Sequence, residues 1–154
     1  MTVAFLSGKR RRAVASIGAV SAGLLVLSAC EKPTPVATVT VGTESVTSEA
    51  ACYNDGKEIK ESELQDCLNK KEGETVKVSP DELIRFGVDP AIADNGWTLF
   101  IDGKPVEQEP YTKTYRSLVG SSFFAESTDS TKIQIVEAKK GKIIGIWTFT
   151  LKKS

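Results

Sequence analysis

The clearest β-hairpin pattern in the chain is Trp97-Thr98-Leu99-Phe100-Ile101-Asp102-Gly103-Lys104-Pro105-Val106. Successive residues of a strand point to opposite sides, so the apolar side chains at positions 97, 99 and 101 share one face. Asp-Gly is a favoured two-residue hairpin turn. Proline has no backbone N–H to donate, and Pro105 therefore marks the returning strand as a sheet edge.

Similar period-two patterns occur on both sides of this hairpin. We expect strands at residues 36–41, 45–52, 74–78, 113–119, 132–137 and 143–152. About eight short strands separated by turn signals are typical of a β-sandwich. The predicted fold is therefore mainly β, an antiparallel immunoglobulin-like β-sandwich with one short helix. The Cys, Trp, Cys order of true immunoglobulin domains is not met, because Cys52 and Cys67 both precede Trp97.

Residues 79–88 fit two patterns. Ser79, Pro80 and Glu82 imitate the start of a helix, whereas the apolar residues at 84, 86 and 88 alternate at the period of a strand. We favour a turn followed by a strand. The connection at 89–96 leaves room for one helical turn.

The N-terminal part of the chain has the regions of a secretory signal peptide. A basic cluster at residues 9–12 precedes an uncharged, mostly apolar run at 13–27. A helix of that length spans roughly 22 Å, which is less than the ~30 Å hydrocarbon core of a bilayer. A permanent transmembrane helix is therefore the weaker interpretation. The expected apolar pair after the arginines of a twin-arginine signal is missing, so Sec export is favoured.

The apolar run ends in Leu27-Ser28-Ala29-Cys30, which resembles the bacterial lipobox. In that motif diacylglycerol is attached to the cysteine sulfur, and a lipoprotein signal peptidase cuts just before the cysteine. The resemblance implies a removed signal peptide at residues 1–29, a lipidated Cys30 with a proline-rich tether at 30–35, and a β-sandwich domain at 36–154. It also implies a protein anchored to the extracytoplasmic face of the cell membrane, with the lipid bilayer as its partner through the diacylglycerol on Cys30. The alternative is an ordinary signal peptide with an incidental cysteine.

Lipidation of Cys30 would leave Cys52 and Cys67 as the only free thiols. Outside the membrane, such a pair in a small domain is expected to form a disulfide. Closing a loop of about 15 residues would contribute about 3 kcal/mol to stability. A redox couple and a two-thiolate metal site are the alternatives, but the first usually has Cys-x-x-Cys spacing and the second needs further ligands.

The segment before Cys67 predicts the one short helix. Ser62-Glu63-Leu64-Gln65 fits a capping box, in which the first side chain would cap the helix N-terminus. Leu64, Cys67 and Leu68 share one helical face, and Gly73 can stop the helix.

Composition excludes several classes of protein. The chain carries 20 basic and 20 acidic residues, and loss of residues 1–29 would remove four basic residues and no acidic one. The resulting acidic excess argues against binding to nucleic acid and against an electrostatic attraction to anionic lipid. The chain has no histidine, and Met1 is its only methionine. The Met and His ligands of copper proteins and the base of a Ser-His-Asp or Cys-His hydrolase are therefore missing, and we expect no metal or cofactor.

One aromatic and polar stretch, residues 110–116, is the candidate binding region. It contains Tyr111, Tyr115 and Arg116, and Phe123 and Phe124 follow closely. Exposed tyrosine and arginine are typical anchors of protein interfaces. We therefore expect a non-catalytic module that binds an envelope protein or polymer. The alternative is that Tyr115 and the two phenylalanines simply pack in the core.

A small carbohydrate-active hydrolase is the rival hypothesis, because paired carboxylates can catalyse glycoside hydrolysis without histidine. The available carboxylates are Asp89, Asp94, Asp102, Glu107 and Glu109. Three local explanations weaken this hypothesis: the turn accounts for Asp102, an Asp-Pro loop for Asp89, and a solvated linker for the two glutamates.

Besides the lipobox and the tether, short distinctive stretches lie at residues 51–56, 87–90, 96–97, 111–116 and 147–151. Together they resemble a family of uncharacterised actinobacterial lipoproteins. The resemblance covers the whole chain after the signal peptide. It implies an outward-facing, lipid-anchored domain and carries no activity with it.

Overall fold

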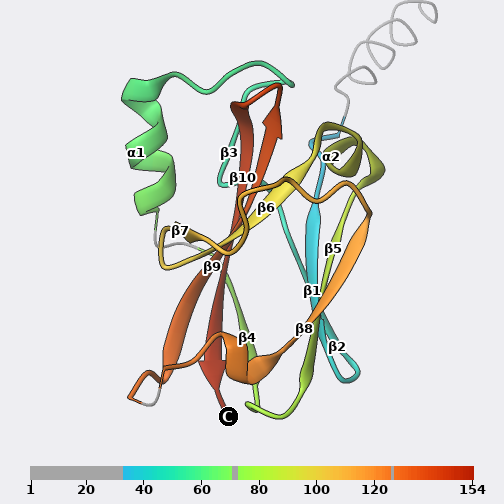
Figure 1. Ribbon diagram of the computed structural model, residues 1–154, viewed down its shortest axis with the longest axis vertical. Coiled ribbons are helices and arrows are strands. Elements are labelled where there is room, and N and C mark those ends of the chain that lie inside the picture. The colour runs from blue at the N-terminus through green and yellow to red at the C-terminus, as the bar shows by residue number, and fades with distance from the viewer. Residues whose placement is uncertain (1–32, 71–72, 126) are drawn as a thin grey trace, which may run out of the picture. The chain divides into compact units, whose positions relative to one another are not determined.

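Two β-sheets pack face to face in the computed structural model, which describes residues 33–70, 73–125 and 127–154 (Figure 1). Sheet A has the strand order β2-β1-β5-β8. Its strands are β1 (Ala37–Val41), β2 (Glu44–Ser48), β5 (Leu83–Val88) and β8 (Tyr115–Val119). The fold is a mainly antiparallel two-sheet sandwich with short helices, which confirms the predicted fold class.

Sheet B has the strand order β3-β10-β9-β6-β7, and β4 also pairs with β10. Its strands are β3 (Cys52–Tyr53), β4 (Glu74–Val78), β6 (Trp97–Ile101), β7 (Lys104–Pro105), β9 (Ser130–Lys139) and β10 (Lys142–Lys153). Two short helices, α1 (Glu61–Asn69) and α2 (Pro90–Asn95), and a 3-10 turn, η1 (Gly120–Ser122), complete the described chain. The sequence predicted one helix. The second helix, α2, lies in the connection at 89–96, where only one helical turn was expected, and it begins with Pro90.

The core lies between the sheets and follows the period-two patterns. The inner face of β1 is apolar and buried, while Thr38 and Thr40 point outward and hydrogen-bond to Thr47 and Ser45 of β2. On β10, Trp147, Phe149 and Leu151 are fully buried in the same core. These side chains share a face as predicted, because alternate strand residues point the same way.

The predicted hairpin forms between β6 and β7, and its turn has the expected backbone. Asp102 and Gly103 both have positive φ, 46° and 80°, as a type I′ turn requires. β7 is the last strand of its sheet, which agrees with the edge position predicted from Pro105. Residues 79–88 form a turn and then β5, as favoured above, and the Glu82 carboxylate accepts a hydrogen bond from the Ser79 N–H at 2.8 Å.

The expected strand at 45–52 is wrong as one unit. β2 ends at Ser48, and the chain then crosses to sheet B, where Cys52 and Tyr53 pair with Ile146 and Gly145. The structure also differs from the prediction of a purely antiparallel fold, because β4 pairs with β10 in parallel.

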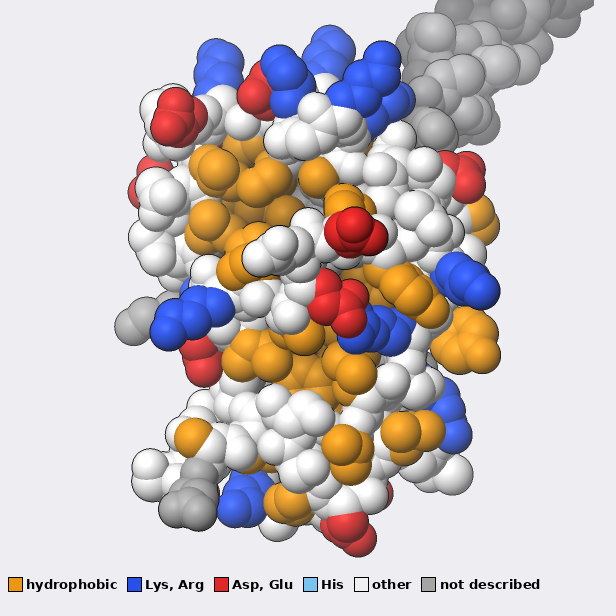
Figure 2. Space-filling view, viewed as in Figure 1, with side chains coloured by type: hydrophobic (Ala, Val, Ile, Leu, Met, Phe, Trp, Pro, Cys, Tyr) orange, Lys and Arg blue, Asp and Glu red, His pale blue; other side chains and the backbone are white. Residues whose placement is uncertain are grey.

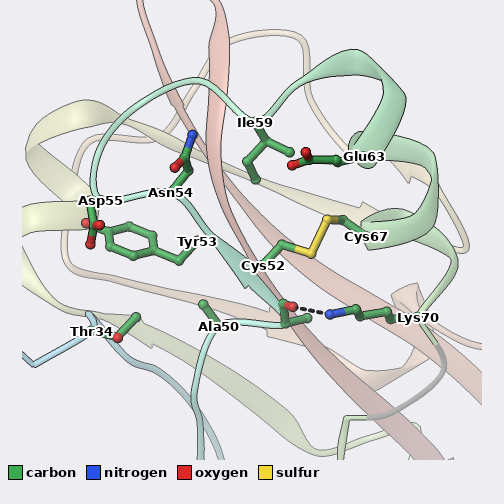
Figure 3. A pocket seen from close by; sticks show the side chains of 11 residues that line it. Thr34, Ala50, Cys52, Tyr53, Asn54, Asp55, Ile59, Glu63, Cys67 and Lys70 are labelled. Atoms are coloured by element: carbon green, nitrogen blue, oxygen red, sulfur yellow. Dashed lines mark hydrogen bonds between the residues drawn. A yellow bond between two sulfur atoms is a disulfide. The ribbon is translucent and has the colours of Figure 1, made fainter.

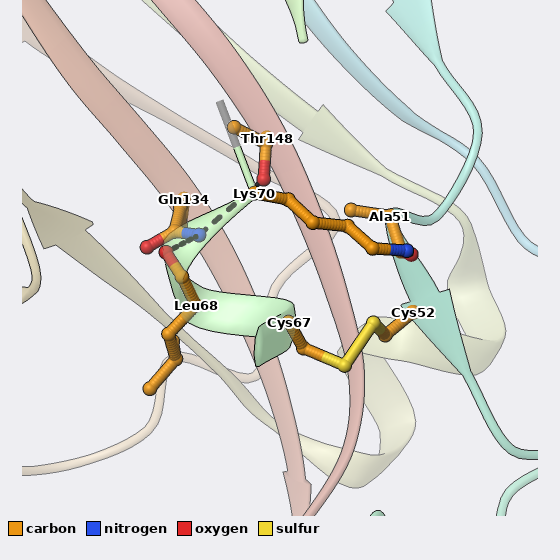
Figure 4. The surroundings of a disulfide bond; sticks show 7 residues. All are labelled: Ala51, Cys52, Cys67, Leu68, Lys70, Gln134 and Thr148. Carbon is orange, nitrogen blue, oxygen red and sulfur yellow. Dashed lines mark hydrogen bonds between the residues drawn. A yellow bond between two sulfur atoms is a disulfide. The ribbon is translucent and has the colours of Figure 1, made fainter. Parts of the chain in front are cut away.

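Helix α1 covers part of the outer face of sheet B, and a disulfide fastens it there. Cys52 of β3 is bonded to Cys67 of α1, with an S–S distance of 2.05 Å (Figure 4), which confirms the predicted pairing. Cys67 and Ile59 pack with Val136 and Ile146 in a second, smaller apolar cluster. The expected capping box is wrong: the helix begins at Glu61, and its N-cap residue, Lys60, makes no side-chain cap hydrogen bond.

The predicted signal peptide and lipidated Cys30 lie outside the described residues. Pro35, which the sequence places in the tether, is buried, and its carbonyl oxygen accepts a hydrogen bond from the indole of Trp147 at 2.9 Å. The packed part of the domain therefore begins at this proline. No helix in the described part of the chain is long and apolar enough to cross a membrane.

Candidate binding surface

Residues 106–114 form a strap that carries the chain from the edge of sheet B to the edge of sheet A. Trp97 and Tyr111 fix its middle by exchanging two backbone hydrogen bonds, of 3.0 and 2.7 Å. The two rings also meet edge to face, with centroids 5.4 Å apart, and the Trp97 indole donates to the carbonyl of Lys113 at 2.9 Å. Because both ends of the strap are tied to strands, it presents a defined surface.

Arg116 joins this strap to β8. Its guanidinium binds the Glu107 carboxylate with two hydrogen bonds, of which the Nη1 to Oε2 bond is 2.7 Å. The guanidinium carbon also lies 5.6 Å from the centre of the Tyr111 ring, within the range of a cation–π contact. Only 16% of the Arg116 side chain is exposed. The arginine therefore holds the strap, and its bidentate partner leaves little of it for a ligand.

Tyr115 lies apart from these residues. It is 65% exposed and precedes Arg116 on β8, so the two side chains leave the strand on opposite sides. Phe123 is buried and lies against Phe86, with ring centroids 5.5 Å apart, and Phe124 packs partly against the core. The core alternative is thus confirmed for the two phenylalanines and wrong for Tyr115. The structure brings Tyr111 and Arg116 together and separates Tyr115 from them.

An apolar groove runs along the outer face of sheet B beside the strap. Its volume is about 350 Å³. Its floor and walls include Phe100, Pro105, Pro110, Val136 and Ile143, with Glu107 and Gln108 at the rim. Figure 2 shows that apolar side chains gather in patches on this side of the molecule. Sheet B is therefore apolar on both faces, and α1 covers the outer one only in part.

A second hollow, of about 490 Å³, opens beside the disulfide (Figure 3). Glu63 and Lys70 of the α1 region face Tyr53, Asn54 and Asp55 across it. The ammonium of Lys70 donates to the carbonyl oxygen of Ala51 at 2.7 Å. This lysine reinforces the disulfide link between α1 and β3.

The five carboxylates of the hydrolase hypothesis do not form one constellation. Asp89 accepts a hydrogen bond from the Val36 N–H and Asp102 accepts one from the Lys132 N–H. Glu107 is paired with Arg116, while Asp94 and Glu109 are exposed. Asp102 and Glu107 border two different hollows. Among the described residues, no group of three acidic, histidine or cysteine side chains is placed to hold a metal ion.

Glu137 of β9 is a buried acid that the sequence patterns did not single out. Its Oε1 accepts a hydrogen bond from the Asn95 amide at 2.7 Å, and its Oε2 has no partner within the described part of the chain. Burial raises the pKa of Glu137, and the Asn95 hydrogen bond and the charge of Lys139 oppose this rise. The pKa of nearby Tyr53 is also raised, first by burial and then by the negative charges of Glu137 and Asp55. The alternation of Ile133, Ile135 and Glu137 could have revealed that this glutamate faces the core.

Comparisons with known proteins bring no activity to this chain. No protein-family model matches the sequence, and no curated protein matches it either. Among solved structures, the chain is similar to the fibronectin(III)-like modules of Clostridium thermocellum CbhA. The match has a TM-score of 0.38 and 9% sequence identity, and it covers 55% of this chain and 94% of that chain.

Proposed function

We propose that this protein is a lipid-anchored, non-catalytic binding module on the extracytoplasmic face of the cell membrane. The anchor is diacylglycerol on Cys30, within the sequence Leu27-Ser28-Ala29-Cys30, and signal peptidase removes residues 1–29. The protein then belongs with the actinobacterial lipoproteins that its sequence resembles. Its partner is a protein of the envelope.

The observation that carries the binding role is the open apolar groove on sheet B. Monomeric proteins rarely leave large apolar patches uncovered, and those with a polar rim mark interaction sites. The groove offers the apolar side chains of Phe100, Val136 and Ile143 but few hydrogen-bonding groups. Such a lining suits apolar side chains of a protein segment better than a sugar polymer, which needs many polar contacts. Tyr111 and Arg116 position the strap that forms one wall.

Mass spectrometry of the protein purified from membranes tests the anchor. We expect the mass of residues 30–154 plus diacylglycerol, with no alkylation of Cys52 or Cys67 before reduction. An unlipidated mass would refute the anchor.

Site-specific photo-crosslinking in living cells tests the groove. A photoreactive amino acid at Gln108 lies on the groove rim, and the same amino acid at Thr47, on the exposed face of β2, is the matched control. We expect a covalent adduct with a defined envelope protein from position 108 alone.

Two charge substitutions show whether that adduct depends on the groove. Pro105→Glu places a charge in the groove and should abolish the adduct from position 108. Thr47→Glu places the same charge on the exposed face of β2 and should leave the adduct unchanged. Identical adducts from both crosslinking positions, or an adduct that survives Pro105→Glu, would contradict the groove as the binding surface.

A further inference from the structure

One end of the sandwich gathers exposed lysines around the point where the packed domain begins. Lys140 lies in the turn between β9 and β10, Lys139 and Lys142 flank it at the strand ends, and Lys57 lies in the neighbouring loop. The hydrogen bond from the Asn54 N–H to the Ile144 carbonyl and the ion pair between Lys142 and Glu58 join loop and turn. We call these four lysines the lysine end.

Pro35 lies at the same end of the molecule. Its carbonyl accepts the Trp147 indole hydrogen bond, and Trp147 lies in the first half of β10. In Figure 1 the first described residues, α2 and the β9–β10 turn lie together at the top, and Figure 2 shows a row of lysine or arginine side chains along that top edge. The chain therefore enters the domain beside the lysine end.

Carboxylates also lie at this end, because Asp55 and Glu58 are exposed in the same loop as Lys57. All four lysines are exposed. Among the described residues, Lys142 has an ion-pair partner in Glu58, and no carboxylate lies within ion-pair distance of Lys57, Lys139 or Lys140. The net charge of the chain after loss of residues 1–29 argued against an electrostatic attraction to anionic lipid, but a net charge does not record where the lysines gather.

The tether is short compared with the domain. Five residues lead from Cys30 to Pro35, and a chain of that length reaches at most about 18 Å. β10 alone has 12 residues, and a strand of that length extends about 35–40 Å. The tether therefore allows the lysine end to approach the bilayer to within the Debye length, about 10 Å at 0.1 M salt, where charge attraction is felt.

We propose that the lysine end docks on anionic phospholipid headgroups, so that the sandwich stands upright on the membrane with its opposite end outward. Clustered lysines beside a membrane anchor are attracted to anionic lipid, and an upright domain would keep its acidic excess away from the same surface. This inference rests on the proposed lipidation of Cys30. Without docking, the tether would also allow the domain to lie on its side.

β10 supplies an internal control. Lys142 lies at its first residue and Lys152 and Lys153 at its last, and all three are exposed. Docking should shield lysines at one end of this strand and leave those at the other end free.

Amine labelling of the lipidated protein in vesicles tests the proposal. The protein is inserted into vesicles of phosphatidylcholine alone or with phosphatidylglycerol, treated with a water-soluble amine reagent, and analysed by peptide mass spectrometry. With phosphatidylglycerol we expect about fivefold slower labelling of the lysine end, unchanged labelling of Lys152 and Lys153, and loss of the difference in high salt.

Two charge-matched double variants sharpen the test. Lys139→Gln with Lys140→Asn should restore labelling of Lys57 and Lys142, whereas Lys152→Gln with Lys153→Gln should change nothing. Asparagine is chosen because Lys140 has a φ of 53°, which asparagine tolerates. If the intact mass confirms the lipid but both ends label equally, or both are shielded, the docking proposal is wrong and the anchor stands. If the mass shows no lipid, both are wrong.

Discussion

The amide of Asn95 donates a 2.7 Å hydrogen bond to Oε1 of Glu137, whose other oxygen has no partner among the described residues. Glu137 is 1% exposed, and burial raises the pKa of its carboxyl above the ordinary value. The folded state therefore holds the proton more tightly than the unfolded state does. The stability that this proton provides is complete at acid pH and is lost as the pH rises through the folded pKa.

Glu137→Gln should remove this pH dependence. At pH 4 and below, both proteins are largely neutral at this position, and their free energies of unfolding should differ little. Near pH 7 the variant should be more stable than the wild type by about 1–2 kcal/mol beyond that small difference, because it buries no charge. Urea unfolding followed from pH 4 to 8 measures the effect. Glu109→Gln, at an exposed position of the strap, is the control and should run parallel to the wild type; parallel curves for Glu137→Gln would refute the prediction.

Removal of the disulfide should loosen α1 more than the sandwich. The double variant Cys52→Ser and Cys67→Ser should lose about 3 kcal/mol of stability, because the unfolded chain is no longer cross-linked. Hydrogen exchange should accelerate first in Glu61–Asn69, the helix that this bond fastens to sheet B. Reduction of the wild type should reproduce both effects and leave the variant unchanged. Equal acceleration in β9 would show that the helix and the core unfold together.

A methyl group at Gly145 should be far more costly than one at Gly87. A Cβ at Gly145 would lie 2.6 Å from the Trp147 ring and 3.0 Å from the Glu137 carboxylate. At Gly87 the nearest atoms lie 3.9 Å away, in ordinary contact. We expect Gly145→Ala to lose about 1–3 kcal/mol by overpacking and Gly87→Ala to stay within about 1 kcal/mol of the wild type. Thermal unfolding of the pair measures the difference, and equal losses would contradict the steric explanation.

Turn chemistry and period-two alternation were sufficient to predict the hairpin of β6 and β7. Asp102-Gly103 adopts the positive φ values that a two-residue turn needs, and Trp97 and Leu99 on β6 are buried in the core as their spacing predicted. The disulfide could also be predicted from the sequence, because Cys52 and Cys67 are the only two cysteines besides Cys30, the predicted lipidation site.

Local sequence patterns could not predict which of the two sheets each strand joins. Residues 45–52 fit the period-two pattern of one strand, yet the chain leaves sheet A after Ser48 and joins sheet B at Cys52. Alternation reports which side of a strand is buried, and both sheets bury a side against the same core. The parallel pairing of β4 with β10 was also missed, because the two strands lie far apart in sequence and local patterns do not record such pairings.

The candidate site was predicted only in part. Its residues on the strap were found, but Arg116 is held by Glu107, and Tyr115 faces away from both. The groove could not be predicted, because it depends on how far α1 covers the outer face of sheet B.

The position of β10 also determines when the fold can form. This strand follows every other described element in the chain, and β3, β4 and β9 all pair with it. A chain that emerges N-terminus first from a ribosome or an export channel can pair β1, β2, β5 and β8, but sheet B must wait for its last partner. Such pairing between distant segments slows folding, so the emerging chain exposes unpaired strand edges to chaperones and proteases until β10 has emerged.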